Sequence, residues 1–430
     1  MQVAAWNLQP VTCNRLYSAC LRQSAMIPYV PMISPNALIF YYHRLNCYSF
    51  NALAGAIDSD PELADISIVR ATTADAVLMS TADAVKRCNR AIVALSIMTC
   101  QMEDMRRLIG LLRLNCGSKV TVLAGGPHVT ACAEEVLAAG ADVAFRGEAE
   151  LSFPAVLGSI AEEREIRGVQ SSPDTVCLDS FPSISPKRGM FGPIEITRGC
   201  AFACSYCQTS HIFGVKLRHR SIESIVRQAL ALQSGNRKVV RLLSPNAFSY
   251  GSPDGRQINL QAMRDLLGAL RKAVTARARI SFAHFPSEAR PEHITPETLD
   301  LLKEFADNDE IVIGAQSGSR RMLEACHRSH TVENVLAAVA LARKRGFKVI
   351  VDFIYGLPGE SEADRKESLA VMEEVVRMGA RIHPHVFAPL PQTAFAREQP
   401  GIISAGVREA MERFASRRGI YYAKAQRAGD

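Results

Sequence analysis

Short apolar runs alternate with amphipathic stretches over residues 35–162, and this alternation is the strongest constraint on the fold of the chain. Continuous apolar strands that alternate with helices are buried on both faces, as in a parallel sheet with helices on either side. The alternation therefore predicts a doubly wound, Rossmann-like α/β domain. Its expected strands are residues 37–42, 66–71, 90–97, 119–124 and 141–146, and its expected helices lie near residues 50–59, 76–86, 102–114, 131–139 and 151–162.

The same alternation resumes with longer helices over residues 191–400. Six successive strand–helix units favour a partial (β/α)6 barrel over a second open sheet. Pro384 falls inside the last expected strand, and because proline is tolerated mainly on edge strands, we expect the barrel to be open there. The expected strands are residues 194–198, 239–243, 279–285, 310–316, 348–355 and 381–387, and the expected helices lie near residues 221–233, 260–275, 296–306, 332–345, 362–378 and 404–416.

Three further segments complete the predicted organisation. Residues 1–34 are interpreted as an irregular N-terminal extension, residues 163–190 as a polar, proline-containing linker, and residues 401–430 as a C-terminal helix and tail. Apolar residues make up 48% and charged residues 22% of the chain, which excludes a mostly disordered protein. The net charge of +7 permits an anionic ligand or RNA but, spread over 430 residues, argues for neither.

The chain carries no sign of a membrane or secretory segment. No apolar run reaches the roughly 18 residues that a membrane-spanning helix needs. The first residues lack a basic stretch followed by an apolar block, so a secretory signal is not expected. Twelve cysteines without such a signal indicate reduced thiols or metal ligands rather than disulfides. We therefore expect a cytoplasmic protein without a membrane span.

Three cysteines within eight residues, Cys200, Cys204 and Cys207, carry the strongest chemical signal. They follow the first expected strand of the second domain, at the strand end where barrel active sites lie. Three converging thiolates can hold three irons of a [4Fe–4S] cluster and leave the fourth iron open to a substrate. A structural zinc ion with His211 as fourth ligand is the alternative, although no second Cys-x-x-Cys pair is present.

The spacing Cys-x-x-x-Cys-x-x-Cys, with Tyr206 directly before the third cysteine, resembles the signature of the radical SAM superfamily. In that superfamily the open iron binds the amino and carboxylate groups of S-adenosylmethionine. One electron from the cluster then cleaves the sulfonium to a 5′-deoxyadenosyl radical. Segments 313–319 and 351–360 are similar to the fourth- and fifth-strand segments of the branch that includes methylthiotransferases and cobalamin-dependent enzymes. The similarity covers about residues 190 to 400.

The resemblance implies contacts to S-adenosylmethionine at the ends of the barrel strands. Tyr206 is expected to cover the adenine, and Gln316 and Ser317 to contact the ribose or the methionyl group. For Gln316 and Asp352, a satisfied polar group of the core is the alternative. The expected contacts are Tyr206, Ser244, Asn246, Glu288, Gln316, Ser317, Asp352, Gly356 and Pro358.

His383 and His385 lie two residues apart on the last expected strand and therefore share one face. If that face is inward, the two imidazoles can meet the substrate. If it is outward, they are surface histidines beside the C-terminal helix. Both orientations stay open at this point.

The first domain carries small and hydroxyl residues in the loops after its expected third, fourth and fifth strands, where open α/β sheets bind ligands. The sequences GGPH at 125–128 and RGEAE at 146–150, ahead of such a barrel, resemble the cobalamin-binding branch of the superfamily. The Asp-x-His-x-x-Gly loop of better-known cobalamin proteins is absent. The resemblance thus implies base-off cobalamin with no histidine below it. His128 is expected to be a turn histidine facing solvent, and its use as the histidine below the cobalamin is the alternative. The expected cobalamin contacts are Ser96, Thr99, Gly125, Gly126, Pro127, Gly147 and Glu148.

These resemblances together imply a radical SAM enzyme with cobalamin as second cofactor, most simply a C-methyltransferase. Its substrate is unknown, and its partner is a low-potential electron donor of the flavodoxin or ferredoxin type. A domain of this kind can also keep its fold while losing the cobalamin. One alternative is a radical SAM enzyme that catalyses a non-methylating rearrangement. Another, from a different class, is a non-catalytic corrinoid or zinc protein.

A tRNA methylthiotransferase-like enzyme is the remaining alternative, because residues 313–393 look close to that group. Such enzymes carry three further cluster cysteines in a different N-terminal domain, whereas the N-terminal cysteines here fall on expected strands and helices. The residues after about 418 are too few for an RNA-binding module. A nucleic-acid partner is therefore not expected.

Overall fold

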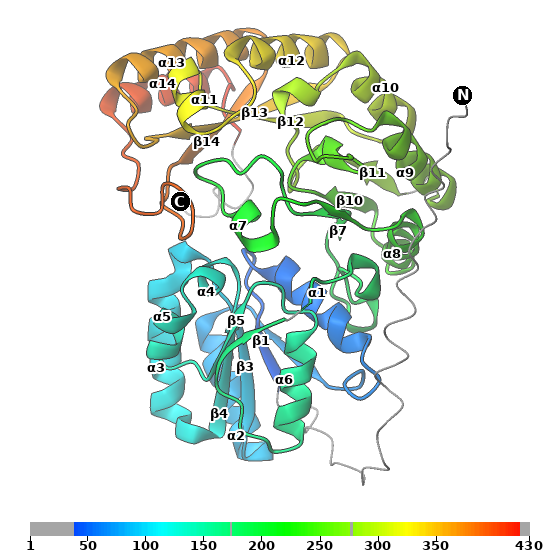
Figure 1. Cartoon of the computed structure of the whole chain (residues 1–430), viewed down its shortest axis with the longest axis vertical. Coiled ribbons are helices and arrows are strands. Elements are labelled where there is room, and N and C mark those ends of the chain that lie inside the picture. Colours follow the sequence, from blue (N-terminus) through cyan, green and yellow to red (C-terminus); the bar gives the residue numbers. More distant parts are fainter. Residues whose placement is uncertain (1–37, 173, 276–277, 422–430) are drawn as a thin grey trace, which may run out of the picture.

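One parallel sheet with helices on both faces forms the first half of the protein (Figure 1). The computed structural model describes residues 38–172, 174–275 and 278–421. Strand order switches between β1 and β3, and ligands of open α/β sheets bind outside the carboxyl ends of the strands at such a point. In spatial order, the strands are β2 (Ile68–Ala71), β1 (Leu38–Tyr41), β3 (Ala91–Ser96), β4 (Val120–Gly125), β5 (Val143–Arg146) and β6 (Gly168–Ser171).

The helices bury both faces of this sheet, which explains why its strands are continuous apolar runs. Leu38 and Phe40 of β1 pack toward α1 and α6, whereas Ile39 and Tyr41 pack toward the opposite layer. One layer consists of α1 (Cys47–Asp58) and α6 (Ser152–Ala161), and the other of α2 (Ala74–Cys88), α3 (Met102–Cys116), α4 (Pro127–Ala131) and α5 (Ala133–Ala138). The predicted doubly wound domain is confirmed.

Two details of this half differ from the prediction. Residues 168–171, inside the expected linker, form β6 and pair in parallel with β5. The apolar pattern misses β6 because this short edge strand joins through backbone hydrogen bonds and contains one strong strand former, Val169. The helix expected over residues 131–139 is instead the pair α4 and α5, which break at Cys132 (φ −129°, ψ 48°).

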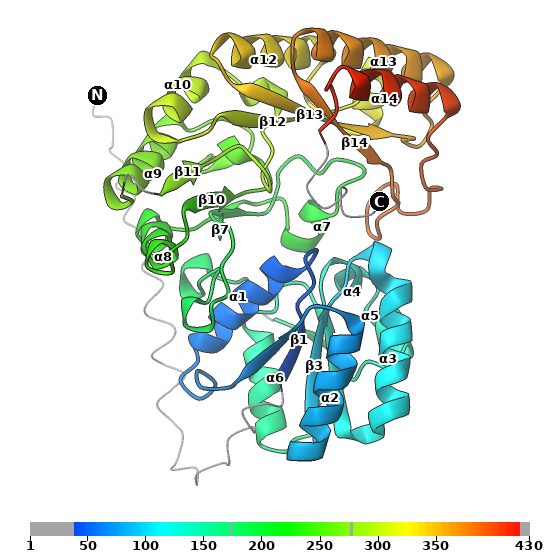
Figure 2. The ribbon, with the colours of Figure 1, turned by 180° about the vertical axis from the view of Figure 1, so that it is seen from behind.

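The second half forms a partial barrel of six parallel strands. One group is β7 (Ile194–Glu195), β10 (Val239–Leu243) and β11 (Arg279–Ser281), and the other is β12 (Glu310–Gln316), β13 (Lys348–Tyr355) and β14 (Arg381–Val386). A parallel bridge between Ala289 and Ile313 joins the two groups. The outer layer contains α8 (Ile222–Ser234), α9 (Leu260–Ala273), α10 (Pro296–Phe305), α12 (Val332–Lys344), α13 (Glu362–Arg377) and α14 (Ala405–Ser416) (Figure 2).

Strand alternation fixes which side chains face the barrel interior. Val351 and Phe353 of β13 and Ile382 of β14 belong to the apolar core beneath the outer helices. Their neighbours Asp352 and His383 therefore point to the inner face, and these two residues are register partners across the pair. The barrel interior near the ends of these strands is consequently polar.

The ends of the barrel depart from the simple pattern. The strand expected over residues 194–198 is split into β7 and β8 (Thr197–Arg198), and β8 pairs with β9 (Arg218–His219) in an antiparallel hairpin. Among the named strands, β14 pairs only with β13, as Pro384 predicts, but the N–H of Ile382 donates to the carbonyl of Gly419 (2.7 Å). The open edge is therefore partly covered by the chain after α14.

Within the described ranges, no helix is long and apolar enough to cross a membrane. The extension expected over residues 1–34 lies outside the described residues, as do residues 422–430 of the expected tail.

Candidate active site

The loop that carries Cys200, Cys204 and Cys207 joins β8 to α7 (Thr209–Phe213). Gly199 enters the loop with φ +94°, and a Cβ atom there would lie 2.6 Å from the carbonyl oxygen of Lys216, so the turn needs glycine. The hydroxyl of Ser210 donates to the carbonyl of Cys200 (2.7 Å), which closes the loop on itself. The loop is thus a turn fixed by Gly199 and a hydrogen bond, and it places three thiols at one end of the barrel.

The thiol positions favour a cluster over a single zinc ion. In a tetrahedral zinc site with Zn–S bonds of about 2.3 Å, neighbouring ligand atoms are about 3.8 Å apart. Among the described residues, two groups of three or more possible ligands have all their ligand atoms within 4.8 Å of one another, and neither contains these cysteines. His211 is exposed on α7. Three thiols that share a loop but lie farther apart suit the larger [4Fe–4S] unit.

A buried arginine lies against this loop. Nη1 of Arg328 is 3.6 Å from Sγ of Cys204 and 3.2 Å from the hydroxyl of Tyr206, and Nη2 donates to the carbonyl of Gly314 (2.6 Å). Burial lowers its pKa, but Tyr206 and Cys204 outweigh burial and raise it, so the side chain stays charged. Its buried Nε has no hydrogen-bond partner.

A cation with an unpartnered donor beside these thiols fits an anionic cluster held by Cys200, Cys204 and Cys207. Sequence reasoning missed Arg328. It stands in the polar run His327–His330, which is indistinguishable from an ordinary turn.

Two carboxyl groups meet inside the barrel, on Glu288 and Asp352. The Nε2 of Gln316 donates to Oε2 of Glu288 (3.2 Å), and Gln316 itself has φ +70° at a register shift in β12. Burial, followed by the charge of Asp352, raises the pKa of Glu288 to about 7. The structure therefore brings together three of the residues predicted to contact S-adenosylmethionine, and a polar residue in a strained conformation points to a ligand.

The two histidines of β14 belong to the same cluster. Nδ1 of His383 lies 2.9 Å from Oδ1 of Asp352, and Nε2 of His385 lies 3.7 Å from that oxygen. Burial raises the pKa of Asp352, but the two histidines together lower it overall. Burial lowers the pKa of His385, but Asp352 raises it overall. The inward orientation that the sequence left open is confirmed for both side chains, and His385 is the more exposed.

The remaining residues predicted for S-adenosylmethionine have other partners. The hydroxyl of Ser317 lies 3.3 Å from that of Ser368 on α13, so it faces the outer layer. The hydroxyl of Ser244 donates to the carbonyl of Asn246 (2.7 Å), and the amide of Asn246 lies 3.0 Å from Nδ1 of His293. Gly356 and Pro358 lie in the turn after β13.

A cavity of about 290 Å³ lies between the two halves of the protein. Its rim is formed by the carboxyl ends of β3, β4 and β5 on one side, and by β7, β8 and α7 on the other. From the rim it reaches down between the sheet and the α1–α6 layer. The deep walls are apolar: Phe50, Leu53, Ala94, Leu123, Phe145 and Phe153.

Six of the seven predicted cobalamin contacts line this cavity. The hydroxyl of Ser96 is buried there without a hydrogen-bond partner, so it is available to a ligand. Thr99 does not line the cavity, and its hydroxyl lies 3.3 Å from Nδ1 of His128. His128 is 5% exposed in α4, so its expected position as a solvent-facing turn histidine is wrong. The lining members are Ser96, Gly125, Gly126, Pro127, Gly147 and Glu148.

A buried network of ion pairs crosses the interface beside the cavity. Arg198 of β8 donates to Glu148 (3.0 Å) and Glu150 (2.6 Å) of the first half, and to Glu195 (2.7 Å) of its own half. Arg218 of β9 also donates to Glu148 (2.9 Å). Burial raises the pKa of Glu148, but Arg218 and Arg198 lower it overall. Glu148 is therefore already engaged by two cations, although it lines the cavity.

The chain resembles known proteins in both halves. Residues 194–372 match the radical SAM superfamily, and residues 54–157 match the B12 binding domain. The tRNA-2-methylthio-N(6)-dimethylallyladenosine synthase of Geobacter metallireducens is 31% identical over 241 residues, which are 55% of this chain and 52% of that protein. An uncharacterized protein of Methanopyrus kandleri is 27% identical over 373 residues, 72% of this chain and 68% of that protein. The chain thus spans about half the length of the first relative.

Solved structures share the two-domain fold. The radical S-adenosylmethionine methyltransferase TsrM from Kitasatospora setae, with cobalamin and a [4Fe–4S] cluster bound, superposes with a TM-score of 0.63 at 16% identity. That comparison covers 84% of this chain and 77% of TsrM. The cobalamin-dependent S-adenosylmethionine radical enzyme OxsB gives a TM-score of 0.60 at 18% identity, over 78% of this chain and 51% of OxsB. The chain therefore carries a radical SAM domain over residues 194–372 and, ahead of it, a B12-binding domain over residues 54–157.

Proposed function

We propose that this protein is a cobalamin-dependent radical SAM methyltransferase that methylates carbon. The carrying observation is that the cysteine loop adjoins the interdomain cavity. The side-chain amide of Gln208, directly after Cys207, donates to the carbonyl of Pro127 at the rim of the cavity (3.0 Å). The cofactors of the proposed enzyme are a [4Fe–4S] cluster, S-adenosylmethionine and cobalamin.

When bound, the reduced cluster with S-adenosylmethionine supplies a 5′-deoxyadenosyl radical, and methylated cobalamin supplies the methyl group. The protein's own part is to hold these groups and to exclude water. Cys200, Cys204 and Cys207 would hold three irons, and the charge of Arg328 would offset the negative charge of the thiolates. A low-potential donor of the flavodoxin or ferredoxin type is the partner that the reaction requires.

In the proposed reaction, the barrel interior binds both S-adenosylmethionine and the substrate that is methylated. The Gln316 amide and the Glu288 carboxyl are hydrogen-bonded to each other. Together they offer a donor and an acceptor to the polar groups of S-adenosylmethionine. Asp352 and its two histidines form a polar wall that the substrate meets. Because Glu288 has a pKa of about 7, it can donate a hydrogen bond at neutral pH as well as accept one.

The interdomain cavity fits a flat ligand with a bulky appended group. The apolar walls between the sheet and the α1–α6 layer can bury the appended group, and the Ser96 hydroxyl can donate to it. Gly125 and Gly126 leave the rim without side chains, so a ring can approach the backbone closely. His128 is turned toward Glu135 and is not part of the cavity lining, so the residues that would hold cobalamin there do not include it.

Metal analysis of anaerobically reconstituted protein tests the proposal. After incubation with hydroxocobalamin and desalting, we expect one cobalt and about four irons per chain, the number in one cubane cluster. Product analysis should show 5′-deoxyadenosine and S-adenosylhomocysteine. The variant Cys204→Ala should lose formation of 5′-deoxyadenosine and keep cobalt, whereas Ser96→Leu, which fills the cavity, should lose cobalt and keep iron. Wild-type protein that retains iron but no cobalt would contradict the cobalamin part of the proposal.

A methylthiotransferase-like activity on tRNA is the second candidate. It is favoured by the 31% identity over 241 residues to the Geobacter metallireducens synthase. The distinguishing measurement is mass spectrometry of nucleosides from tRNA incubated with reconstituted protein and S-adenosylmethionine. A methylthio product would favour this candidate, and its absence together with bound cobalt would favour C-methylation.

A further inference from the structure

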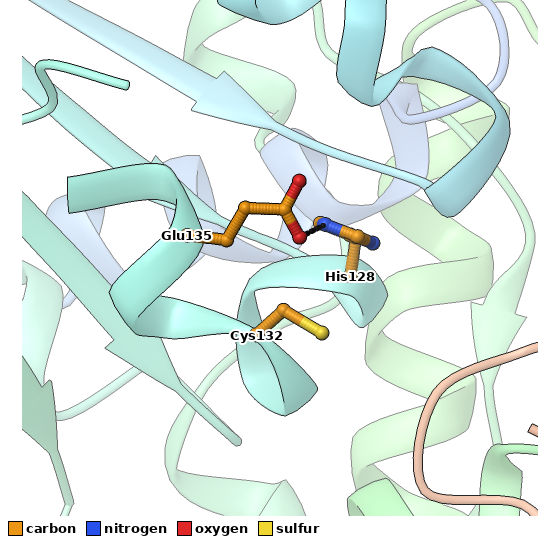
Figure 3. A group of neighbouring side chains, drawn as sticks. All are labelled: His128, Cys132 and Glu135. Atoms are coloured by element: carbon orange, nitrogen blue, oxygen red, sulfur yellow. Dashed lines mark hydrogen bonds and ion pairs between the residues drawn. The ribbon is translucent and has the colours of Figure 1, made fainter. Parts of the chain in front are cut away.

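Three side chains of metal-ligand type lie together on the α4–α5 segment, outside the site described above (Figure 3). They are His128 of α4, Cys132 at the junction, and Glu135 of α5. One ligand atom of each lies within 4.8 Å of the other two. Nε2 of His128 and Oε2 of Glu135 are 3.3 Å apart.

The spacing along the chain explains why the three side chains meet. Residues at i, i+4 and i+7 lie on one stripe of an α-helix. The backbone leaves helical geometry only at Cys132, so His128 and Glu135 sit on the helical turns before and after the thiol. The segment therefore offers one nitrogen, one sulfur and one oxygen to a common point.

The other polar atoms of these side chains have partners elsewhere. Nδ1 of His128 lies 3.3 Å from the hydroxyl of Thr99, which can accept its proton. Oε1 of Glu135 accepts from Nη2 of Arg106 (2.9 Å). Histidines and carboxylates that bind metals are held in this way by neighbours, which fix the ring and the carboxylate and leave one atom of each for the ion. The atoms left over are His128 Nε2, Cys132 Sγ and Glu135 Oε2.

We propose that His128, Cys132 and Glu135 form a binding site for Zn²⁺ or a similar transition-metal ion, with water as fourth ligand. A donor set of nitrogen, sulfur and oxygen suits zinc, whereas magnesium and calcium prefer oxygen alone. His128 follows Pro127 directly, and Pro127 both lines the cavity and accepts the Gln208 amide. An ion held by His128 would therefore lie one residue along the chain from the Pro127–Gln208 contact, and its binding does not depend on the methylation chemistry.

Zinc content and zinc affinity of the full chain test this site. To keep the cluster cysteines from binding zinc, the measurement uses protein already reconstituted with iron and sulfide. We expect about one zinc per chain, and affinity reduced by at least about 100-fold in Cys132→Ser and in His128→Gln, since even the outer partners of ligands contribute 10–100-fold. Cys116→Ser, at the half-buried end of α3, is the matched control and should bind zinc as wild type does.

Cobalt(II) spectroscopy identifies the ligands directly. In the full chain with Cys200, Cys204 and Cys207 replaced by serine, cobalt(II) should give a thiolate charge-transfer band, and Cys132→Ser in this background should abolish it. Glu135→Gln replaces a half-exposed carboxylate by a neutral amide, so it should weaken binding without unfolding the protein. Zinc affinity that is equal in wild type, Cys132→Ser and Glu135→Gln would overturn the proposal and leave His128 and Glu135 as a hydrogen-bonded pair only.

Discussion

Glu288 is a carboxyl group whose ionisation works against folding. Burial and the charge of Asp352 raise its pKa from 4.5 to about 7. The folded state therefore keeps a proton that the unfolded chain releases near pH 4.5. The stability from that proton is complete below pH 4.5 and is lost as the pH rises through about 7. At one pKa unit per 1.4 kcal/mol, the loss is about 3 kcal/mol.

The variant Glu288→Gln should therefore be more stable than wild type at pH 8, and its advantage should shrink toward pH 5. Melting temperatures measured across this range, without cofactors, provide the test. The control is Glu103→Gln, whose side chain is 67% exposed and should show no such trend. A pH-independent difference between Glu288→Gln and wild type would show that Glu288 does not titrate in this range.

Arg328 should set the reduction potential of a cluster bound to the cysteine loop. A buried cation near the cluster favours the reduced state, which carries one more negative charge. We expect Arg328→Gln to lower the potential by about 59 mV or more, a tenfold change for a one-electron couple. A redox titration monitored by electron paramagnetic resonance measures this potential. Arg328→Lys keeps the charge, so its reduction potential should stay near that of wild type. Equal reduction potentials for Arg328→Gln and wild type would contradict the assignment.

At the residue scale, the sequence reveals chemistry that is concentrated in a short motif. The three cysteines of the loop lie within eight residues of the chain, so their spacing alone points to a shared metal. The contacts of Arg328 with Cys204 and of Asp352 with His383 join residues that are distant in sequence, and no local pattern predicts these two contacts. His128 was expected to face solvent because a histidine after Gly-Gly-Pro looks like a turn residue, whereas α4 begins at Pro127 and buries it.

Among the elements, the turn between β4 and α4 depends on a single glycine. Gly126 has φ +100°, and a Cβ atom there would lie 2.6 Å from the backbone nitrogen of Ile97. Gly168 at the start of β6 also has positive φ (+83°), but a Cβ atom there meets nothing within 4 Å. Both substitutions by alanine strain the backbone, and only Gly126→Ala adds a steric clash.

We therefore expect Gly126→Ala to destabilise the protein by about 1–3 kcal/mol more than Gly168→Ala, as overpacking does. Chemical denaturation followed by circular dichroism compares the two variants. Because Gly126 lines the cavity, its variant should also retain less cobalamin. Equal destabilisation of the two variants would mean that the turn can open to accept a side chain.

The sequence predicts helices and strands correctly where burial requires a periodic apolar pattern. The strands of both sheets are covered by helices, so their apolar runs and the capped helices between them are visible, as for α10 with its Thr295 cap and Pro296. The β8–β9 hairpin and β6 are two to four residues long and owe their pairing to backbone hydrogen bonds. Elements of that kind leave no periodicity, so sequence reasoning merged them into a longer strand or a linker.

At the scale of the whole molecule, the candidate site exists only because the two halves meet. The cavity takes its rim from three strand ends of the sheet and from the start of the barrel, and neither half encloses it alone. The Gln208–Pro127 contact and the Arg198 network cross the same interface. The relative position of the domains is therefore part of the site, and what holds the domains together also holds the proposed cofactors in register.

Loss of Arg198 should destabilise both domains, because its guanidinium is buried among three carboxylates that come from both. Removing one partner of a buried ion pair costs about 3–5 kcal/mol, since the other charge stays buried. We expect Arg198→Gln to lower the melting temperature and to speed hydrogen exchange in residues 143–150 and 194–219 together. Arg107→Gln is the control: Arg107 and its partners Glu103 and Asp104 are 69%, 67% and 75% exposed, so it should change stability by less than about 0.5 kcal/mol. If exchange rises on one side of the interface only, Arg198 stabilises its own domain and the two halves are held by their remaining contacts.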